Sequence, residues 1–221
     1  MNDKARRLAA ALFAATMLAT MVASGASAHG DDRESRGHDL ARARHATAQF
    51  RNLATAVAAG YGLPPAPAPL HSCISSLTGP GAMGFHYING SLLDTTVDPA
   101  RPEVLVYAPD RSGRLHLVAL EYVVFQAPWK AAHGDTVPML FGQMFMATGE
   151  PNRYDIPAFF SLHVWLWKHN PTGLFAPFNP KVSCDPSGPP RHDDDRAGAA
   201  TAALFACAID RAPKAATTAR T

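Results

Sequence analysis

Three ionisable residues of the kinds that bind metals or move protons stand in segments that are otherwise apolar. They are His86, Glu121 and His163, and each lies in a short run with the alternation expected of a β-strand. Successive side chains of a strand point to opposite faces of its sheet. If the three faces coincide, two imidazoles and one carboxylate meet in a single concavity.

This donor set has a defined chemistry. Two imidazoles and a carboxylate are used by zinc hydrolase sites and by non-haem iron sites. A divalent metal, zinc or iron, is therefore the expected cofactor, with His86, Glu121 and His163 as its ligands. Without a metal, Glu121 and His163 are candidate catalytic residues in acid–base chemistry, because desolvation raises the pKa of a glutamate and histidine titrates near neutral pH.

The same residues also allow a purely structural interpretation. A histidine on an apolar strand commonly hydrogen-bonds to the backbone inside the core, while Glu121 could pair with an arginine or a tyrosine, or point outward from a sheet edge. The two interpretations stay open at this point, because a shift of one residue in strand register would invert the face of a side chain.

Aromatic residues flank the candidate site. Trp165 and Trp167 follow the alternation of His163, and Tyr87 follows His86 directly. We expect Trp165 and Tyr87 to line the pocket. A second class of function uses no chemistry at all: a binding module whose Trp- and Met-rich pocket holds an apolar small ligand or contacts a cell-envelope partner. Its candidate lining residues are Met139, Met144, Met146, Trp165 and Trp167.

The elements that must position these residues are one helix and a set of strands. Apolar residues recur every three or four positions over 40–60, which predicts an amphipathic helix that ends at Gly60, Gly62 and Pro64. Strand-like runs follow at 84–89, 103–108, 115–125, 139–146 and 159–169, and the Pro/Asp/Gly link at 109–113 is typical of a hairpin. The pattern predicts an α+β fold, with an N-terminal amphipathic helix packed on a curved, barrel-like antiparallel sheet of about five strands.

The N-terminus has the three parts of a secretory signal peptide. Lys4, Arg6 and Arg7 precede an apolar run, and a small-residue cleavage site ends at Ala28. The apolar run is short for a membrane span of about 20 residues. We therefore expect a leader at 1–28, a mature chain without a membrane span, and a secreted or periplasmic location in a bacterium.

Charge and composition restrict the remaining chain. Removal of Lys4, Arg6, Arg7 and Asp3 with the leader leaves 17 basic and 17 acidic residues. Nucleic-acid binders need a basic surplus, so that class of partner is excluded, whereas a small-molecule ligand or substrate is not. We expect a mobile polar lead-in at 29–39, one α+β domain at 40–184, and a low-complexity, disordered tail at 185–221.

The three cysteines bear on both compartment and fold. Disulfides persist in exported proteins, and Cys73 and Cys184 bracket the segment that has folded character. We predict a bond between them, worth about 4–5 kcal/mol in the chain-entropy model because the closed loop is long. Cys207 lies in the tail and is left unpaired or available to another chain.

Several common enzyme classes leave no trace in the sequence. The chain carries no Gly-rich phosphate loop, no Gly-x-Ser-x-Gly turn, no His-Glu-x-x-His helix and no Cys-x-x-Cys pair. These absences argue against nucleotide enzymes, α/β-hydrolases, zincins and thioredoxin-like proteins.

The most distinctive segment runs from residue 161 to residue 184. It has the pattern HVWLWxxNPxGxF followed by NPxVSC, with turn-forming Asn-Pro pairs at 170–171 and 179–180. Together with 85–89 and 102–107, this segment resembles a group of secreted bacterial proteins to which no activity is assigned. The resemblance covers residues 40–184. It implies export and one compact domain, and it brings no substrate, cofactor or catalytic residue.

Overall fold

The structure, a computed structural model, describes residues 26–185. Most of the predicted leader and nearly all of the predicted tail, with Cys207, lie outside the described residues. The last three residues of the predicted leader begin the first described helix.

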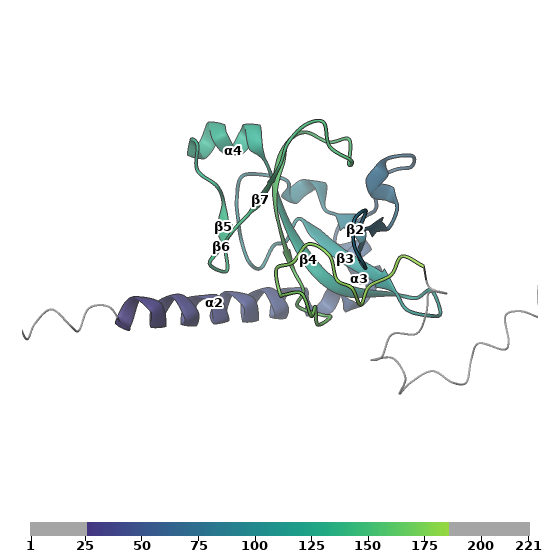
Figure 1. Ribbon diagram of the computed structural model, residues 1–221, viewed down its shortest axis with the longest axis horizontal. Helices are drawn as coiled ribbons and strands as arrows, with labels where there is room; N and C mark the ends of the chain where they lie inside the picture. The colour runs from purple at the N-terminus through teal and green to yellow at the C-terminus, as the bar shows by residue number, and fades with distance from the viewer. Residues whose placement is uncertain (1–25, 186–221) are drawn as a thin grey trace, which may run out of the picture. The chain divides into compact units, whose positions relative to one another are not determined.

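The N-terminal helical region is longer and more broken than the sequence predicts. Helix α2 covers Ala26–Thr47, the 3₁₀ turn η1 covers Ala48–Arg51 and helix α3 covers Leu53–Ala58 (Figure 1). The predicted lead-in at 29–39 is therefore helical, and the predicted single helix at 40–60 is interrupted. Asn52 causes the restart, because its side chain accepts hydrogen bonds from the backbone N–H groups of Ala54 and Thr55.

Helix α2 is not amphipathic over its whole length. Of its described side chains, only Ala43 and Thr47, near its C-terminal end, are fully buried. The preceding part is polar and contains Gly30, Gly37 and three aspartates, so it has no apolar face. The prediction of a helix packed on the sheet is confirmed, while the prediction of its amphipathic character holds only near its end.

Six strands form a curled antiparallel sheet in the order β1-β2-β3-β4-β8-β7 (Figure 1). Their bounds are Ile74–Ser75 for β1, Ala82–Ile88 for β2, Val104–Pro109 for β3, Leu115–Phe125 for β4, Met146–Thr148 for β7 and Phe159–Val164 for β8. The hairpin that joins β3 to β4 is confirmed, since Pro109 pairs with Leu115. The α+β class and the antiparallel sheet are thus confirmed.

Two segments differ from their predicted form. The strand predicted at 139–146 is instead a small hairpin of β5, Met139–Leu140, and β6, Gln143–Met144, followed by β7. Its turn residues Phe141 and Gly142 both have positive φ angles, as a type I′ turn requires. An unpredicted helix, α4, covers Gln126–His133 directly after β4, and short 3₁₀ turns cover Pro69–His71 and Gly90–Leu92.

The two faces of the sheet carry two separate cores. The helix-covered face packs against α2, η1 and α3, and includes Leu105, Tyr107, Leu120, Tyr122 and Leu162. The opposite face carries Val104, Val106, Ala119 and Val123 and packs against Trp165 and Val182. We call residues 165–184 the strap and this second surface the strap-covered face.

The strap is held down by its own asparagines and by a disulfide. The backbone of Asn179 exchanges two hydrogen bonds with Ala82, and its side-chain amide donates to the carbonyl of His169. Asn170 donates to the carbonyl of Phe178. The predicted disulfide is confirmed: Cys73 and Cys184 are bonded, with Cα atoms 5.6 Å apart. The predicted strand at 159–169 therefore ends at Val164, where the strap turns over the sheet.

Over residues 26–185, no helix combines the length and the apolar character needed to cross a bilayer.

Candidate metal centre

The register of the sheet brings Glu121 and His163 together. They are direct partners on the antiparallel strands β4 and β8. Directly opposed residues have Cβ atoms about 4.5–5.5 Å apart, so the two side chains meet on one face. Neighbouring positions Val123 and Ser161 form the next pair in the ladder on that same face.

His86 reaches the same point from two strands away. It pairs with Val106 on β3, which pairs with Ala119 on β4. Adjacent strands lie about 4.7–4.9 Å apart, so the imidazole must cross the width of β3 to meet Glu121. The residues of β3 on this face are Val104 and Val106, so no side chain of β3 larger than valine stands between the two groups.

Gly84 brings β2 close enough for this reach. Its φ angle is +125°, and a Cβ atom at this position would lie 2.4 Å from the carbonyl oxygen of Tyr107. A distance below 3.0 Å is not tolerated by real side chains, so any other residue would push β2 away from β3. Glycine at position 84 thus helps to place His86, two residues further along β2.

A β-bulge between β3 and β4 changes the face of the sheet to which Leu117 points. Val106 pairs with Ala119 but Tyr107 pairs with Leu117, so Val118 is the extra residue. Simple alternation from Leu115 to Val123 would put Leu117 on the same face as Glu121. Because of the bulge, Leu117 packs in the helix-covered core instead.

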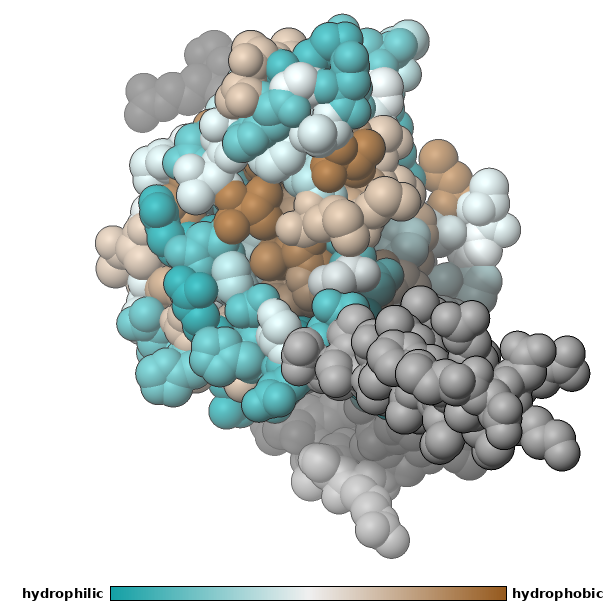
Figure 2. Space-filling model, turned by 90° about the vertical axis from the view of Figure 1, so that its left-hand side faces the viewer, coloured by the Kyte–Doolittle hydropathy of each residue, from teal (hydrophilic) through white to brown (hydrophobic). Residues whose placement is uncertain are grey.

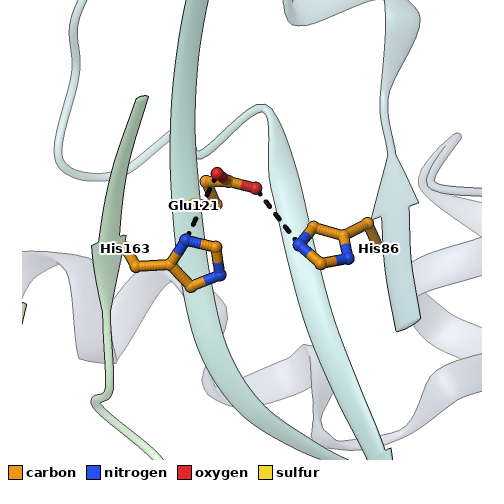
Figure 3. A group of neighbouring side chains, drawn as sticks. All are labelled: His86, Glu121 and His163. Carbon is orange, nitrogen blue, oxygen red and sulfur yellow. Dashed lines mark ion pairs between the residues drawn. The ribbon is translucent and has the colours of Figure 1, made fainter. Parts of the chain in front are cut away.

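The three side chains form a compact group with Glu121 between the two histidines (Figure 3). The Nε2 atom of His86 lies 3.4 Å from Oε2 of Glu121, and Nδ1 of His163 lies 3.2 Å from Oε1. The two imidazole centroids are 5.6 Å apart. One donor atom from each residue can be chosen so that all three lie within 4.8 Å of one another. Among the described residues this is the one such group of histidine, cysteine or carboxylate side chains.

The group is buried and incompletely hydrogen-bonded. His86, Glu121 and His163 expose 3%, 8% and 4% of their surfaces. Neither Nδ1 of His86 nor Nε2 of His163 has a hydrogen-bond partner of acceptable geometry. Buried polar atoms without partners are uncommon, because each costs about 1–3 kcal/mol.

Electrostatics fix the protonation of two members. Burial alone would raise the pKa of Glu121, but the charges of the two histidines and hydrogen bonds from His163 and Ser161 outweigh it and hold the pKa at about 2. Burial lowers the pKa of His86 to about 4, against the opposing attraction of Glu121 and the backbone of Gly84. At neutral pH the group therefore contains a carboxylate and a neutral His86 imidazole, which are metal-binding forms.

Some residues near the group were expected and others were not. Trp165 lies beside His163, with ring centroids 6.1 Å apart, and its indole N–H donates to the carbonyl of Ala176 in the strap. Ser161 hydrogen-bonds to Glu121, and the charge of Glu121 acts on the half-buried Tyr154. Ser161 could be found from its alternation with His163, whereas Tyr154 lies in a loop and gave no periodic signal.

Other predicted pocket residues lie elsewhere. Tyr87 packs edge-on against Tyr107 in the helix-covered core, because neighbours in a strand point to opposite faces. It is therefore not a wall of the site. Trp167 also packs against the helix-covered core, since β8 ends before it.

The predicted Trp- and Met-rich pocket does not exist as one site. Met139, Met144 and Met146 are 58%, 67% and 53% exposed. Hydrophobic residues are visible at the surface on the side of the molecule where α4 and the β5–β6 hairpin lie (Figure 2). Trp165, in contrast, is buried on the strap-covered face.

Comparison of the chain with known families, curated proteins and solved structures gives no match. The resemblance to secreted bacterial proteins therefore stays a prediction, and the candidate site rests on its own geometry.

Proposed function

We propose that this protein is an exported domain that binds one divalent transition-metal ion, zinc or ferrous iron, through His86, Glu121 and His163. The observation that carries the proposal is the convergence of three buried donors from three separate strands within 4.8 Å. Over the described residues, Glu121 has no ion pair with a lysine or arginine, and its ionisable partners are the two histidines.

The incomplete hydrogen bonding supports a ligand rather than a closed polar network. A buried network that serves only stability normally satisfies each of its polar atoms. Here Nε2 of His163 has no partner, and Nδ1 of His86 has only the backbone of Gly84 nearby, outside the geometry of a hydrogen bond. A metal ion that accepts lone pairs from the imidazoles would offset part of the cost of their burial.

The pKa values of Glu121 and His86 argue against either residue as a metal-free general base. A general base works best when its pKa lies near the working pH. The pKa of Glu121, held at about 2, and that of His86, lowered to about 4, are both far below neutral pH. A bound metal would supply Lewis acidity and an activated water or dioxygen ligand, as three-ligand sites do.

The surroundings limit the size of the substrate. With the three ligands at most 8% exposed and Trp165 and the strap above them, we assign the site to a small molecule. In this role Ser161 orients the Glu121 carboxylate by its hydrogen bond, and Trp165 excludes water next to His163.

The same burial favours one alternative, a non-catalytic binding domain in which the metal only holds three strands together. Structural metal sites are closed to solvent, whereas catalytic sites keep an accessible position. Both alternatives predict metal binding and differ in whether a small external ligand can reach the ion.

We also propose that the protein is secreted or periplasmic, like the bacterial proteins that it resembles. The Cys73–Cys184 disulfide supports an oxidising compartment, and the leader-like N-terminus supports export.

Elemental analysis of the full chain, exported and purified without chelators, tests the proposal. We expect one zinc or iron ion per chain, retained by a His116→Ala control because His116 is exposed and bonded only to surface residues. His163→Ala should lose the ion. Glu121→Gln keeps the size of the side chain and should lose the ion as well. This variant provides the test if His163→Ala folds poorly.

Two results would contradict the proposal. One is a wild-type chain that stays metal-free after incubation with Zn²⁺ or with Fe²⁺ under anaerobic conditions. The other is metal retained equally by the wild type and by folded His163→Ala and Glu121→Gln variants. Azide titration of the cobalt-substituted protein then separates the alternatives, since only an accessible ion changes its visible spectrum.

A further inference from the structure

An open groove lies beside the helix-covered core and shares no lining residue with the candidate metal centre. It has a volume of about 550 Å³ and is lined by Arg44, Arg51, Asn52, His116, Leu117 and Trp167. These residues come from the end of α2, from η1 and the residue after it, from the start of β4 and from the strap. We call it the basic groove.

Two guanidinium groups are stacked on the indole of Trp167. The Cζ atom of Arg44 lies 4.7 Å from the ring centroid and that of Arg51 lies 5.7 Å from it, both within cation–π range. The indole N–H donates to Thr47, at 3.3 Å, and Arg44 donates to the carbonyl of Leu166. Contacts between α2 and the strap therefore hold Trp167 and Arg44 in place.

The positive charge of the groove is not balanced within it. No lining residue carries a carboxylate, and over residues 32–185 neither Arg44 nor Arg51 forms an ion pair. Arg42, on the same helix, pairs with Asp98 at 2.9 Å. Asp110, the acid bonded to His116, is also paired with Arg114. The groove therefore presents two guanidinium groups without an ion pair to an incoming anion.

We infer that the basic groove binds a small organic anion through a carboxylate or phosphate group. A guanidinium presents its N–H donors as a fork that matches both kinds of oxyanion, and two forks give a specific site. The volume falls within the range of about 300–1,000 Å³ that holds small organic ligands, and it is larger than one inorganic ion needs. Leu117 provides an apolar wall for the remainder of the ligand.

Nuclear magnetic resonance of the ¹⁵N-labelled full chain tests this inference. The probes are benzoate, phenyl phosphate and neutral benzyl alcohol, each titrated at low ionic strength. The readout is the indole N–H signal of Trp167, identified by its loss in Trp167→Phe. We expect a saturable shift with at least one of the two anions, and the comparison of the two assigns the carboxylate or the phosphate group. We expect no saturable shift with benzyl alcohol.

Variants connect the signal to the two arginines. Arg51→Gln should weaken binding about tenfold or more, since it removes a charge-assisted hydrogen bond, and Arg51→Lys should have an intermediate effect. The exposed Arg33 on α2 provides a matched control, and Arg33→Gln should bind like the wild type. Equal binding of benzyl alcohol, an unchanged affinity in folded Arg44→Gln and Arg51→Gln variants, or no saturable shift with either anion would overturn the inference. His163→Ala should leave anion binding intact, so this result does not depend on the metal proposal.

Discussion

The two faces of the sheet bury polar groups in opposite ways. On the helix-covered side, the hydroxyls of Tyr61, Tyr107 and Tyr122 each donate to a backbone carbonyl, at 2.8, 2.6 and 2.7 Å. On the strap-covered face, His86 and His163 each keep a nitrogen without a partner. Nε of Arg36 on α2 is also without a partner, so the contrast holds for these tyrosines and histidines and not for every buried group. Buried polar atoms without partners are uncommon, and the two histidines therefore indicate that the strap-covered face has a second purpose.

Two buried glutamates, Glu103 and Glu121, have pKa values shifted in opposite directions. Burial raises the pKa of Glu103 to about 8, even though its carboxylate accepts a hydrogen bond from the backbone N–H of Val123. The pKa of Glu121 is held at about 2, because two histidines flank it. Burial is similar for both residues, so the charged neighbours decide whether a carboxylate in this domain is ionised at neutral pH.

Removal of the disulfide should have the largest effect and should act on the strap side. Replacing Cys73 and Cys184 together by serine should lower the free energy of unfolding by up to about 4–5 kcal/mol, because the bond closes a long loop. Denaturant unfolding measures this loss, and hydrogen exchange should show it first in residues 165–184. A Cys207→Ser control should unfold like the wild type. Equal loss of protection in α2 and the strap would contradict the separation of the two faces.

The pH dependence of stability should separate the two glutamates. The folded pKa of Glu103, about 8, exceeds its ordinary value of 4.5. Its contribution to stability is therefore complete below about pH 4.5 and is lost as the pH rises to about 8. Glu103→Gln removes this dependence, so the variant should gain about 3–5 kcal/mol relative to the wild type across that interval.

Denaturant unfolding of the wild type and of Glu103→Gln at several pH values gives the difference in their free energies of unfolding. The titration of His86 contributes equally to both proteins and cancels in this difference. The exposed Glu34 supplies the control, since Glu34→Gln should show no such trend. A pH-independent difference for Glu103→Gln would mean that Glu103 is ionised when folded.

Apolar replacement of the metal centre should stabilise the metal-free chain. Changing His86, Glu121 and His163 together to leucine removes a buried charged group, and such replacements are often neutral or stabilising by about 1–4 kcal/mol. Thermal unfolding in the presence of a chelator measures this gain. Added Zn²⁺ should stabilise the wild type and leave the triple variant unchanged. A large loss of stability in the variant would mean that the group is a structural network.

The smallest effect is expected from removal of one hydroxyl group on the helix-covered face. Tyr107→Phe removes one satisfied hydrogen bond to the carbonyl of Phe50 and should cost about 1 kcal/mol, with no change in metal content. Leu105→Ala, on the same strand and face, should cost more, about 2–5 kcal/mol, because it leaves a cavity. Metal loss in Tyr107→Phe would show that the two faces are coupled.

Much of the fold was predictable because its signals are local. The alternation in Leu115–Phe125 predicts β4 to the residue, and the Pro/Asp/Gly link predicts the hairpin before it. The disulfide followed from the positions of Cys73 and Cys184 at the ends of the folded segment. The convergence of His86, Glu121 and His163 was also anticipated, although it depended on a register that the sequence does not specify.

The remaining features depend on contacts that are distant in sequence. The restart at Asn52 is a single capping interaction that a periodic pattern cannot reveal. The split of 139–146 depends on Phe141, which takes a positive φ angle and buries its ring against Tyr122. The bulge at Val118 reversed the predicted facing of Leu117. The misplacement of Trp167 has a similar origin, since the strap redirects the chain after Val164.

The close approach of β2 and β3 gives this protein a signature that can be searched for. Gly84 is required where a Cβ atom would meet the carbonyl of Tyr107, and His86 follows it by two positions. A distant relative that shares the site should keep a Gly-x-His strand, a glutamate two strands away, and a His-x-Trp pair matching His163 and Trp165. Its loops, helices and tail could diverge freely. A spaced pattern of five residues can thus find relatives that comparison of whole chains does not.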